Sequence, residues 1–222
     1  MTRDSYQDQL ETLREDVLYM SEVAVDRLRQ GLNALETKDE QLAREVIEGD
    51  DEVNELYLDV EQSCIDLFAL QQPVASDLRF IAASFKISTD LERVGDLAVN
   101  LGDYTLEAQH ERFPEVDIQS IGDETVAMIE TAMEAYATED PGLCQSVVDR
   151  DEDVDRRCER ASNEIIGELI DSHFDTDDRQ ALMVDVSRLL LTVRDLERVG
   201  DHAVNIAART YYQVESDDAL IY

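Results

Sequence analysis

Two copies of one eleven-residue motif place oxygen-bearing side chains at helical spacing. Residues 90–100 read DLERVGDLAVN and residues 195–205 read DLERVGDHAVN, so ten of the eleven positions match. On a helix that turns about 100° per residue, every fourth position falls on one side, here the side opposite the apolar stripe. The resulting rows are Glu92, Asp96 and Asn100 in the first copy, and Glu197, Asp201 and Asn205 in the second.

Such rows could bind hard metal ions. Two carboxylates one turn apart on a helix repel each other, and a bridging cation would remove that cost. Oxygen ligands suit magnesium, calcium, manganese or iron better than structural zinc, although the sequence leaves the choice among these metals open. Two carboxylates are too few for a tight site. The preceding helix can supply further oxygens at matching positions, namely Asp50 with Asn54 in the first half and Asp151 with Asp155 in the second.

A plainer interpretation of these rows must be weighed against metal binding. The chain has 53 Asp and Glu residues, so acid pairs at this spacing also arise by chance. Arg93 and Arg198 lie within reach of the rows and could form surface ion pairs. The duplication favours a function, because the two motifs kept their residues while the flanking sequences diverged. Gly95 and Gly200 predict close helix–helix approach, and His202 is expected to be a half-buried packing residue.

The spacing of apolar residues predicts an all-α protein of six long helices. Apolar positions recur every three or four residues, and the alternation of a β-strand is absent. Residues 37–40, TKDE, have the form of a capping box that would open the second helix. Asp140 and Pro141 supply an N-cap and an N1 proline for the fifth. The predicted helices cover 3–36, 37–71, 74–109, 119–138, 140 to about 169, and 177–213.

The repeat divides the chain into two tandem three-helix bundles related by internal duplication. The helices that precede the motifs also correspond, since residues 50–53 read DDEV and residues 151–154 read DEDV. The segment 113–117, which contains Pro114, is the expected boundary. The predicted bundles are therefore residues 1–112 and 113–222.

Composition excludes several classes of function. With 19 Lys and Arg against 53 acids, the net charge of −34 disfavours direct nucleic-acid binding, which depends on neutralising phosphates. No apolar run is long enough to insert into a membrane. The cysteines, Cys64, Cys144 and Cys158, lack metal-site spacing and predict reduced thiols in a cytoplasmic protein. The acidic surface is typical of proteins from salt-adapted organisms. No nucleophile motif or Gly-rich phosphate loop is present, which predicts a protein that is not an enzyme.

At the duplicated motif the sequence resembles the PhoU family. The match is DLERVGDxAVN in both halves, and residues 72–79, QPVASDLR, resemble the family's approach to the third helix. The second half departs from the latter pattern, because residues 177–180, DDRQ, contain no proline. The resemblance implies two bundles side by side that bind multinuclear metal clusters through Glu92/Asp96 and Glu197/Asp201.

The resemblance also implies a role and partners. It implies negative regulation of phosphate uptake, through contact with the ATPase or permease of a phosphate ABC transporter and in some cases with a sensor kinase. A homodimer is expected on the same basis. Two alternatives stay open at this point. One is a metal-storage or metal-responsive helical protein that serves another transporter. The other is a structural bundle whose acids contribute only solubility.

Overall fold

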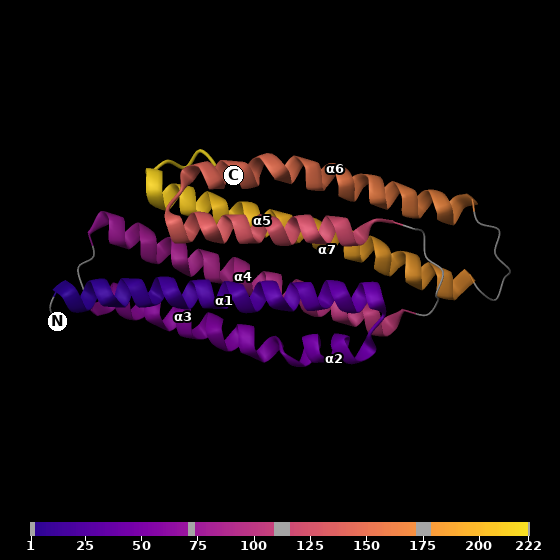
Figure 1. Ribbon diagram of the computed structural model, residues 1–222, viewed down its shortest axis with the longest axis horizontal. Helices are drawn as coiled ribbons and strands as arrows, with labels where there is room; N and C mark the ends of the chain where they lie inside the picture. The colour runs from indigo at the N-terminus through magenta and orange to yellow at the C-terminus, as the bar shows by residue number, and fades with distance from the viewer. Residues whose placement is uncertain (1–2, 71–73, 109–115, 172–178, 222) are drawn as a thin grey trace.

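The prediction of an all-α protein is confirmed. The computed structural model describes residues 3–70, 74–108, 116–171 and 179–221, and these residues form helices and no strand. The helices are α1 (Arg3–Thr37), α2 (Glu40–Glu48), α3 (Asp50–Leu70), α4 (Ala75–Glu107), α5 (Ile118–Thr138), α6 (Pro141–Asp171) and α7 (Arg179–Glu215) (Figure 1).

The second predicted helix is interrupted at Gly49, which separates α2 from α3. The missing side chain of Gly49 leaves room for the guanidinium of Arg27 on α1. That guanidinium donates to the carbonyl oxygen of Glu45 at 3.1 Å and to the carboxylate of Glu52 at 2.8 Å. Arg27 therefore satisfies a carbonyl at the end of α2 while holding the start of α3, and α2 and α3 together occupy the place of one long helix.

Of the two predicted helix caps, one is confirmed and the other is wrong. Asp140 accepts a hydrogen bond from the Gly142 backbone N–H at 2.8 Å, as expected for the cap of α6. The capping box at residues 37–40 is wrong, because Thr37 still belongs to α1. Asp39 is the N-cap instead, and it accepts from the backbone N–H groups of Gln41 and Leu42. The sequence pattern therefore placed this cap two residues too early.

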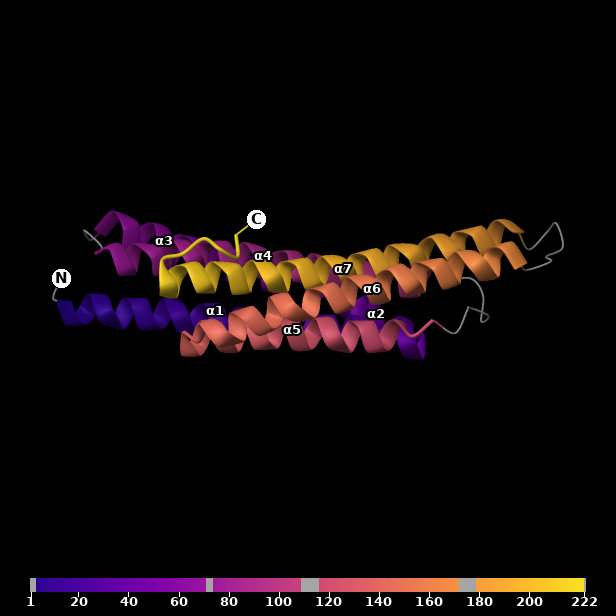
Figure 2. The same ribbon diagram turned by 90° about the horizontal axis from the view of Figure 1, so that it is seen from above.

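The two halves of the chain form two helical bundles that lie along each other. α1, α2, α3 and α4 make the first bundle, and α5, α6 and α7 make the second (Figures 1 and 2). Between the bundles, α1 contacts α5 and α4 contacts α7. The buried apolar side chains of both halves form one continuous core. The predicted boundary after residue 112 lies within 109–115, outside the described residues.

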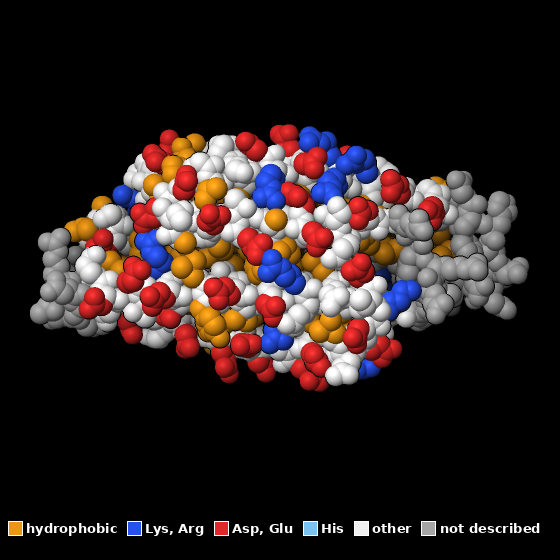
Figure 3. Space-filling model, viewed as in Figure 1, with side chains coloured by type: hydrophobic (Ala, Val, Ile, Leu, Met, Phe, Trp, Pro, Cys, Tyr) orange, Lys and Arg blue, Asp and Glu red, His pale blue; other side chains and the backbone are white. Residues whose placement is uncertain are grey.

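The surface of the molecule is dominated by acidic side chains. Figure 3 shows Asp and Glu spread over the whole visible face, with hydrophobic side chains gathered in a band between α1 and α5. The acids therefore cover this face and do not collect at one end of it. Within the described ranges, no helix has the length and apolar character needed to cross a membrane.

All three thiols lie in the core. Cys64, Cys144 and Cys158 are free and fully buried. Burial raises the pKa of the Cys64 thiol to about 12 and that of Cys144 to about 11. Burial likewise raises the pKa of Cys158 to about 12. The thiolate is the nucleophile, so these side chains are protected both by packing and by protonation.

We therefore expect the native thiols to react with Ellman's reagent about 100-fold more slowly than the thiols of the urea-unfolded chain. Folding raises the pKa of Cys64 and Cys144 above the ordinary 9.0, so the folded state keeps protons that the unfolded state releases. The contribution of these thiols to the free energy of unfolding is thus constant below about pH 8. It is lost as the pH rises from about 9 towards the pKa values of the folded thiols. Rapid labelling of any cysteine in the folded chain would contradict this assignment.

Candidate functional site

The two copies of the motif lie at the middle of the α4–α7 contact, each beside the helix that precedes it. A Cβ atom on Gly95 would lie 3.1 Å from Val53 of α3. A Cβ atom on Gly200 would lie 3.3 Å from the Oδ1 atom of Asp151 on α6. These contacts agree with the expected close helix–helix approach at both glycines. They also bring the acids of α3 and α6 towards the rows on α4 and α7.

The two motifs are joined by reciprocal hydrogen bonds across the α4–α7 contact. The amide of Asn100 donates to Asp195 at 3.0 Å, and the amide of Asn205 donates to Asp90 at 3.2 Å. The first residue of each motif therefore accepts from the last residue of the other. Both asparagines, predicted as ends of the metal rows, direct their amide groups to the contact between the bundles.

Further polar groups complete each end of this pairing. The Asp195 carboxylate is buried and also accepts from the Tyr104 hydroxyl at 2.8 Å. Arg198 lies 3.4 Å from the same carboxylate. At the other end, Nδ1 of His202 lies 2.8 Å from Asp90. The expectation that His202 is half-buried is confirmed, but its environment is polar as well as packed.

Replacing Tyr104 by phenylalanine should reduce the free energy of unfolding by about 1–2 kcal/mol, because a buried carboxylate loses a hydrogen-bond donor. Urea unfolding at neutral pH measures this difference. Tyr19→Phe is the matched control, since Tyr19 is 52% exposed. Equal stabilities of the two variants would argue against a structural role for the Tyr104–Asp195 bond.

The first acidic row is partly neutralised by its own helix. Arg93 lies 3.4 Å from Glu92 and 3.0 Å from Asp96, as the plain ion-pair interpretation predicts. Burial, followed by Asp96, raises the pKa of Glu92 above its ordinary value, while Arg93 opposes the shift. On α3, the amide of Asn54 donates to the Asp50 carboxylate at 2.8 Å. Most of the polar groups at this site therefore already have partners.

The second row lacks this compensation. Arg198 pairs with Asp195 and not with Glu197 or Asp201, and no ion pair to either acid is present among the described residues. Burial and the neighbouring acids, Asp155 first, raise the pKa of both Glu197 and Asp201. Arg194 opposes the pKa shift of Glu197, and His202 and Arg198 oppose that of Asp201, so the four carboxyl groups from α6 and α7 are only partly compensated.

Asp151 has the least favourable surroundings for a carboxylate in this group. Burial, followed by Asp155, Asp201 and Glu197, raises its pKa to about 6. Its Oδ1 atom is buried and has no hydrogen-bond partner. A buried carboxylate oxygen without a partner destabilises the fold unless a cation or donor is supplied. This oxygen is the feature of the site that best fits a bound metal ion.

The structure brings the predicted residues together in two unequal groups. Asp151, Asp155, Glu197 and Asp201 influence one another electrostatically, whereas Glu92 and Asp96 share Arg93 and have Asp50 nearby. Within the described residues, no three His, Cys, Asp or Glu side chains already converge as a metal ligand set. Metal binding at either group would therefore require some side chains to reorient, and the ligand prediction stays a prediction.

Sequence reasoning missed Asp90, Asp195 and Tyr104 as polar partners. The two aspartates were inside the repeated motif and lay beside its apolar stripe on the helical wheel, so their position was a usable signal. Tyr104 lies outside the motif, one turn beyond Asn100 on α4. Its role depends on α7, and no local pattern indicates it.

Known proteins resemble this chain along nearly its whole length. The PhoU domain family profile matches residues 17–105 and 118–210. A relative from Clostridium acetobutylicum, named phosphate-specific transport system accessory protein PhoU homolog, is 31% identical over 217 residues and aligns over 96% of each chain. A similarly named relative from Pseudomonas aeruginosa is 33% identical, with 95% of this chain and 85% of the relative aligned.

Solved structures agree with this result. The crystal structure of PhoU from Pseudomonas aeruginosa superposes with a TM-score of 0.87 at 32% identity, and covers 96% of this chain and all of that one. The phosphate transport system regulatory protein PhoU from Streptococcus pneumoniae gives the same TM-score at 25% identity, with 96% of this chain and 98% of that chain aligned. This chain therefore shares its fold with both of these structures, and the family profile matches it twice.

Proposed function

This chain belongs to the PhoU domain family, and from that premise we propose that it is a metal-binding regulator of phosphate transport. Its relatives are named as accessory proteins of the phosphate-specific transport system. In the proposed mechanism the protein lowers phosphate uptake when phosphate is plentiful. It does so by docking on the ATPase or permease of a phosphate ABC transporter, or on a sensor kinase coupled to that transporter. The family is regulatory, and no catalytic step is assigned to the chain.

The observation that carries the metal-binding part of the proposal is the partnerless Oδ1 atom of Asp151 among three further acids. Asp151, Asp155, Glu197 and Asp201 would hold the metal in the second half. Glu92, Asp96 and Asp50 would hold it more weakly in the first, because Arg93 already neutralises that row. A bound iron, manganese, magnesium or zinc ion would add positive charge among the four carboxyl groups of the second half.

The charge of the chain supports docking on a transporter from the cytoplasm. Cytoplasmic loops of membrane proteins are enriched in Lys and Arg, and a protein of net charge −34 would be attracted to them. Added salt should weaken this attraction. We further propose a homodimer in solution, which light scattering of the purified protein would test as a particle of twice the 25.2 kDa chain mass.

The regulatory role is tested by phosphate uptake in phosphate-replete cells that lack the gene. We expect uptake to stay high, because nothing signals the transporter to stop. Complementation with the natural chain should restore the decrease, and the quadruple variant Asp151→Asn, Asp155→Asn, Glu197→Gln, Asp201→Asn should not. Four acid-to-amide changes at exposed acids of α6 and α3 provide the control. Unchanged uptake in the deletion strain would favour a metal-storage or metal-responsive role with another transporter.

A further inference from the structure

A groove of about 450 Å³ lies between α1 and α5, where the two bundles meet. α1 packs mainly on α4, and α5 packs mainly on α7, so these two helices lie side by side with less extensive contact between them. Figures 1 and 2 place both helices on the same side of the molecule. The groove runs within the band of hydrophobic side chains that Figure 3 shows between them.

The floor of the groove is apolar. Leu18 and Val25 line it from α1, where they lie two turns apart on one side of the helix, and Met133 lines it from α5. Val25 and Met133 are 6% and 5% exposed and belong to the core, and Leu18 is partly buried against that core. A hydrophobic side chain placed in the groove would therefore extend the core and remove apolar surface from water.

The rim of the groove is acidic on both sides. Glu22 and Asp26 line it from α1, and Glu130 and Glu134 line it from α5; all four are exposed. Among the described residues that line the groove, the only base is Arg29, which pairs with Glu130 at 2.6 Å. Carboxylates thus flank the apolar floor along both helices.

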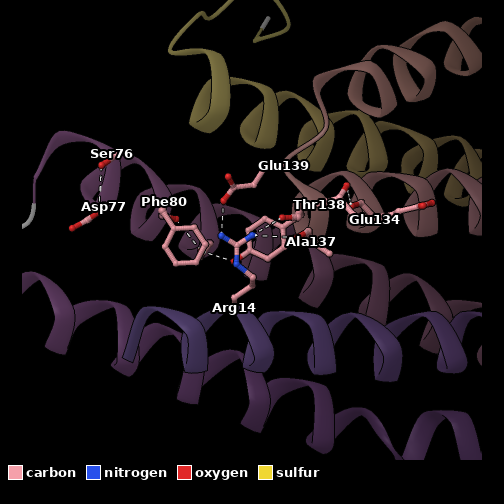
Figure 4. Close-up of polar contacts among 10 residues, drawn as sticks. Arg14, Ser76, Asp77, Phe80, Glu134, Ala137, Thr138 and Glu139 are labelled. Carbon is pink, nitrogen blue, oxygen red and sulfur yellow. Dashed lines mark hydrogen bonds and ion pairs between the residues drawn. The ribbon is translucent and has the colours of Figure 1, made fainter. Parts of the chain in front are cut away.

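Two ion pairs between α1 and α5 bound the groove. Arg14, one turn before Leu18, donates to the carbonyl oxygen of Tyr136 at 3.0 Å and to Glu139 at 2.6 Å (Figure 4). Arg29, one turn after Val25, makes the second pair. These contacts fix α1 relative to α5, so the groove is already formed and a ligand need not separate the bundles.

The charge and shape of the groove select the occupant. The acidic rim would repel nucleic acid and anionic lipid headgroups. A second copy of this chain would bring the same acids and a net charge of −34 to the rim, and would also be repelled. A helix with one apolar face fits between two helices when its apolar residues recur every three or four positions. Lys and Arg beside that face would meet the rim acids.

We propose that the α1–α5 groove docks a basic amphipathic helix of a partner protein. Apolar side chains of that helix pack on Leu18, Val25 and Met133, and its Lys and Arg side chains pair with the rim acids. The inference rests on the proposed regulatory role and deepens it, because it names the docking surface and the chemistry of the partner. The groove includes no residue of either acidic row.

The test uses a labelled peptide of Lys and Leu, roughly 14 residues or four helical turns long, whose leucines recur every three or four residues. Its fluorescence anisotropy is followed as the purified full chain is added at ~0.15 M salt. We expect saturable binding of one peptide per chain. A peptide of the same composition with shuffled leucines, and one with Glu in place of Lys, should each bind at least about tenfold more weakly.

Charge reversal at the rim locates the binding site. The double variant Glu22→Lys, Glu134→Lys changes one acid on each side of the groove and should weaken peptide binding about tenfold or more. The double variant Glu159→Lys, Glu164→Lys is the matched control, since it makes the same change in net charge at exposed acids of α6. The control should change the affinity less than about twofold.

A change in the floor tests the apolar contact separately. Leu18→Gln should weaken peptide binding about tenfold, because the apolar face of the peptide loses its partner. Tyr19→Gln is the control on the same helix, since Tyr19 is 52% exposed outside the groove, and it should leave the affinity unchanged. Thermal unfolding of both variants checks that they remain folded.

The proposal is overturned if no saturable binding occurs, or if the amphipathic and shuffled peptides bind equally, since attraction to the whole acidic surface would then explain the result. Equal weakening by the two double variants would exclude the groove as the site. A chain that is a dimer on its own and is dissociated by the peptide would show that a second copy occupies the groove. The measurement needs no transporter, so its failure would leave the uptake experiment and the regulatory role standing.

Discussion

Asp151→Asn is expected to stabilise the metal-free protein by about 1 kcal/mol while weakening metal binding by about 100-fold. The two effects have one cause. In the metal-free chain the Asp151 carboxylate is partly buried with a partnerless Oδ1 atom and lies near Asp155, Glu197 and Asp201. An amide of the same shape removes this repulsion. It also removes the charge that a metal ion would use.

This opposite response distinguishes a binding site from a structural acid. Thermal unfolding should be recorded in EDTA and then in excess manganese or iron. The variant should unfold at the higher temperature in EDTA, and the natural chain should gain more from the metal. Glu164→Gln, an exposed acid on the same helix, should shift neither curve. Destabilisation of the metal-free protein by Asp151→Asn would indicate that Asp151 serves the fold, and would remove the main support for metal binding.

Arg14→Met is expected to reduce the free energy of unfolding by about 3 kcal/mol. Arg14 on α1 donates to the Tyr136 carbonyl oxygen at the end of α5 and pairs with Glu139 at 2.6 Å (Figure 4). Its guanidinium also lies over the Phe80 and Tyr136 rings. A charged hydrogen bond contributes about 1.5–3 kcal/mol, and a partly buried cation–π contact adds about 1. Methionine keeps the aliphatic volume and loses both interactions.

The effect should be large because Arg14 joins the two bundles. Urea unfolding followed by circular dichroism measures the change. Arg44→Met is the matched control, since Arg44 forms an exposed pair within α2 that is worth less than about 0.5 kcal/mol. A similar small loss in both variants would show that the α1–α5 contact depends on apolar packing and not on this arginine.

Much of the fold follows from local sequence. Apolar residues at three- and four-residue spacing identify a helix wherever they occur, and Asp140 with Pro141 marks the start of α6, because both signals depend only on neighbouring residues. The repeated motif likewise predicted the duplication and placed Glu92/Asp96 and Glu197/Asp201 on matching faces. These features were available from the sequence because each is determined within a few helical turns.

Only the tertiary structure decided which partner each of these polar side chains has. Arg93 and Arg198 occupy equivalent motif positions, yet Arg93 pairs with the acids of its own row and Arg198 with Asp195. Asn100 and Asn205 donate to aspartates about a hundred residues away. Such partners are set by the packing of α4 on α7, and helical periodicity carries no information about it. For the same reason, the break at Gly49 became visible only when helices distant in sequence were brought together.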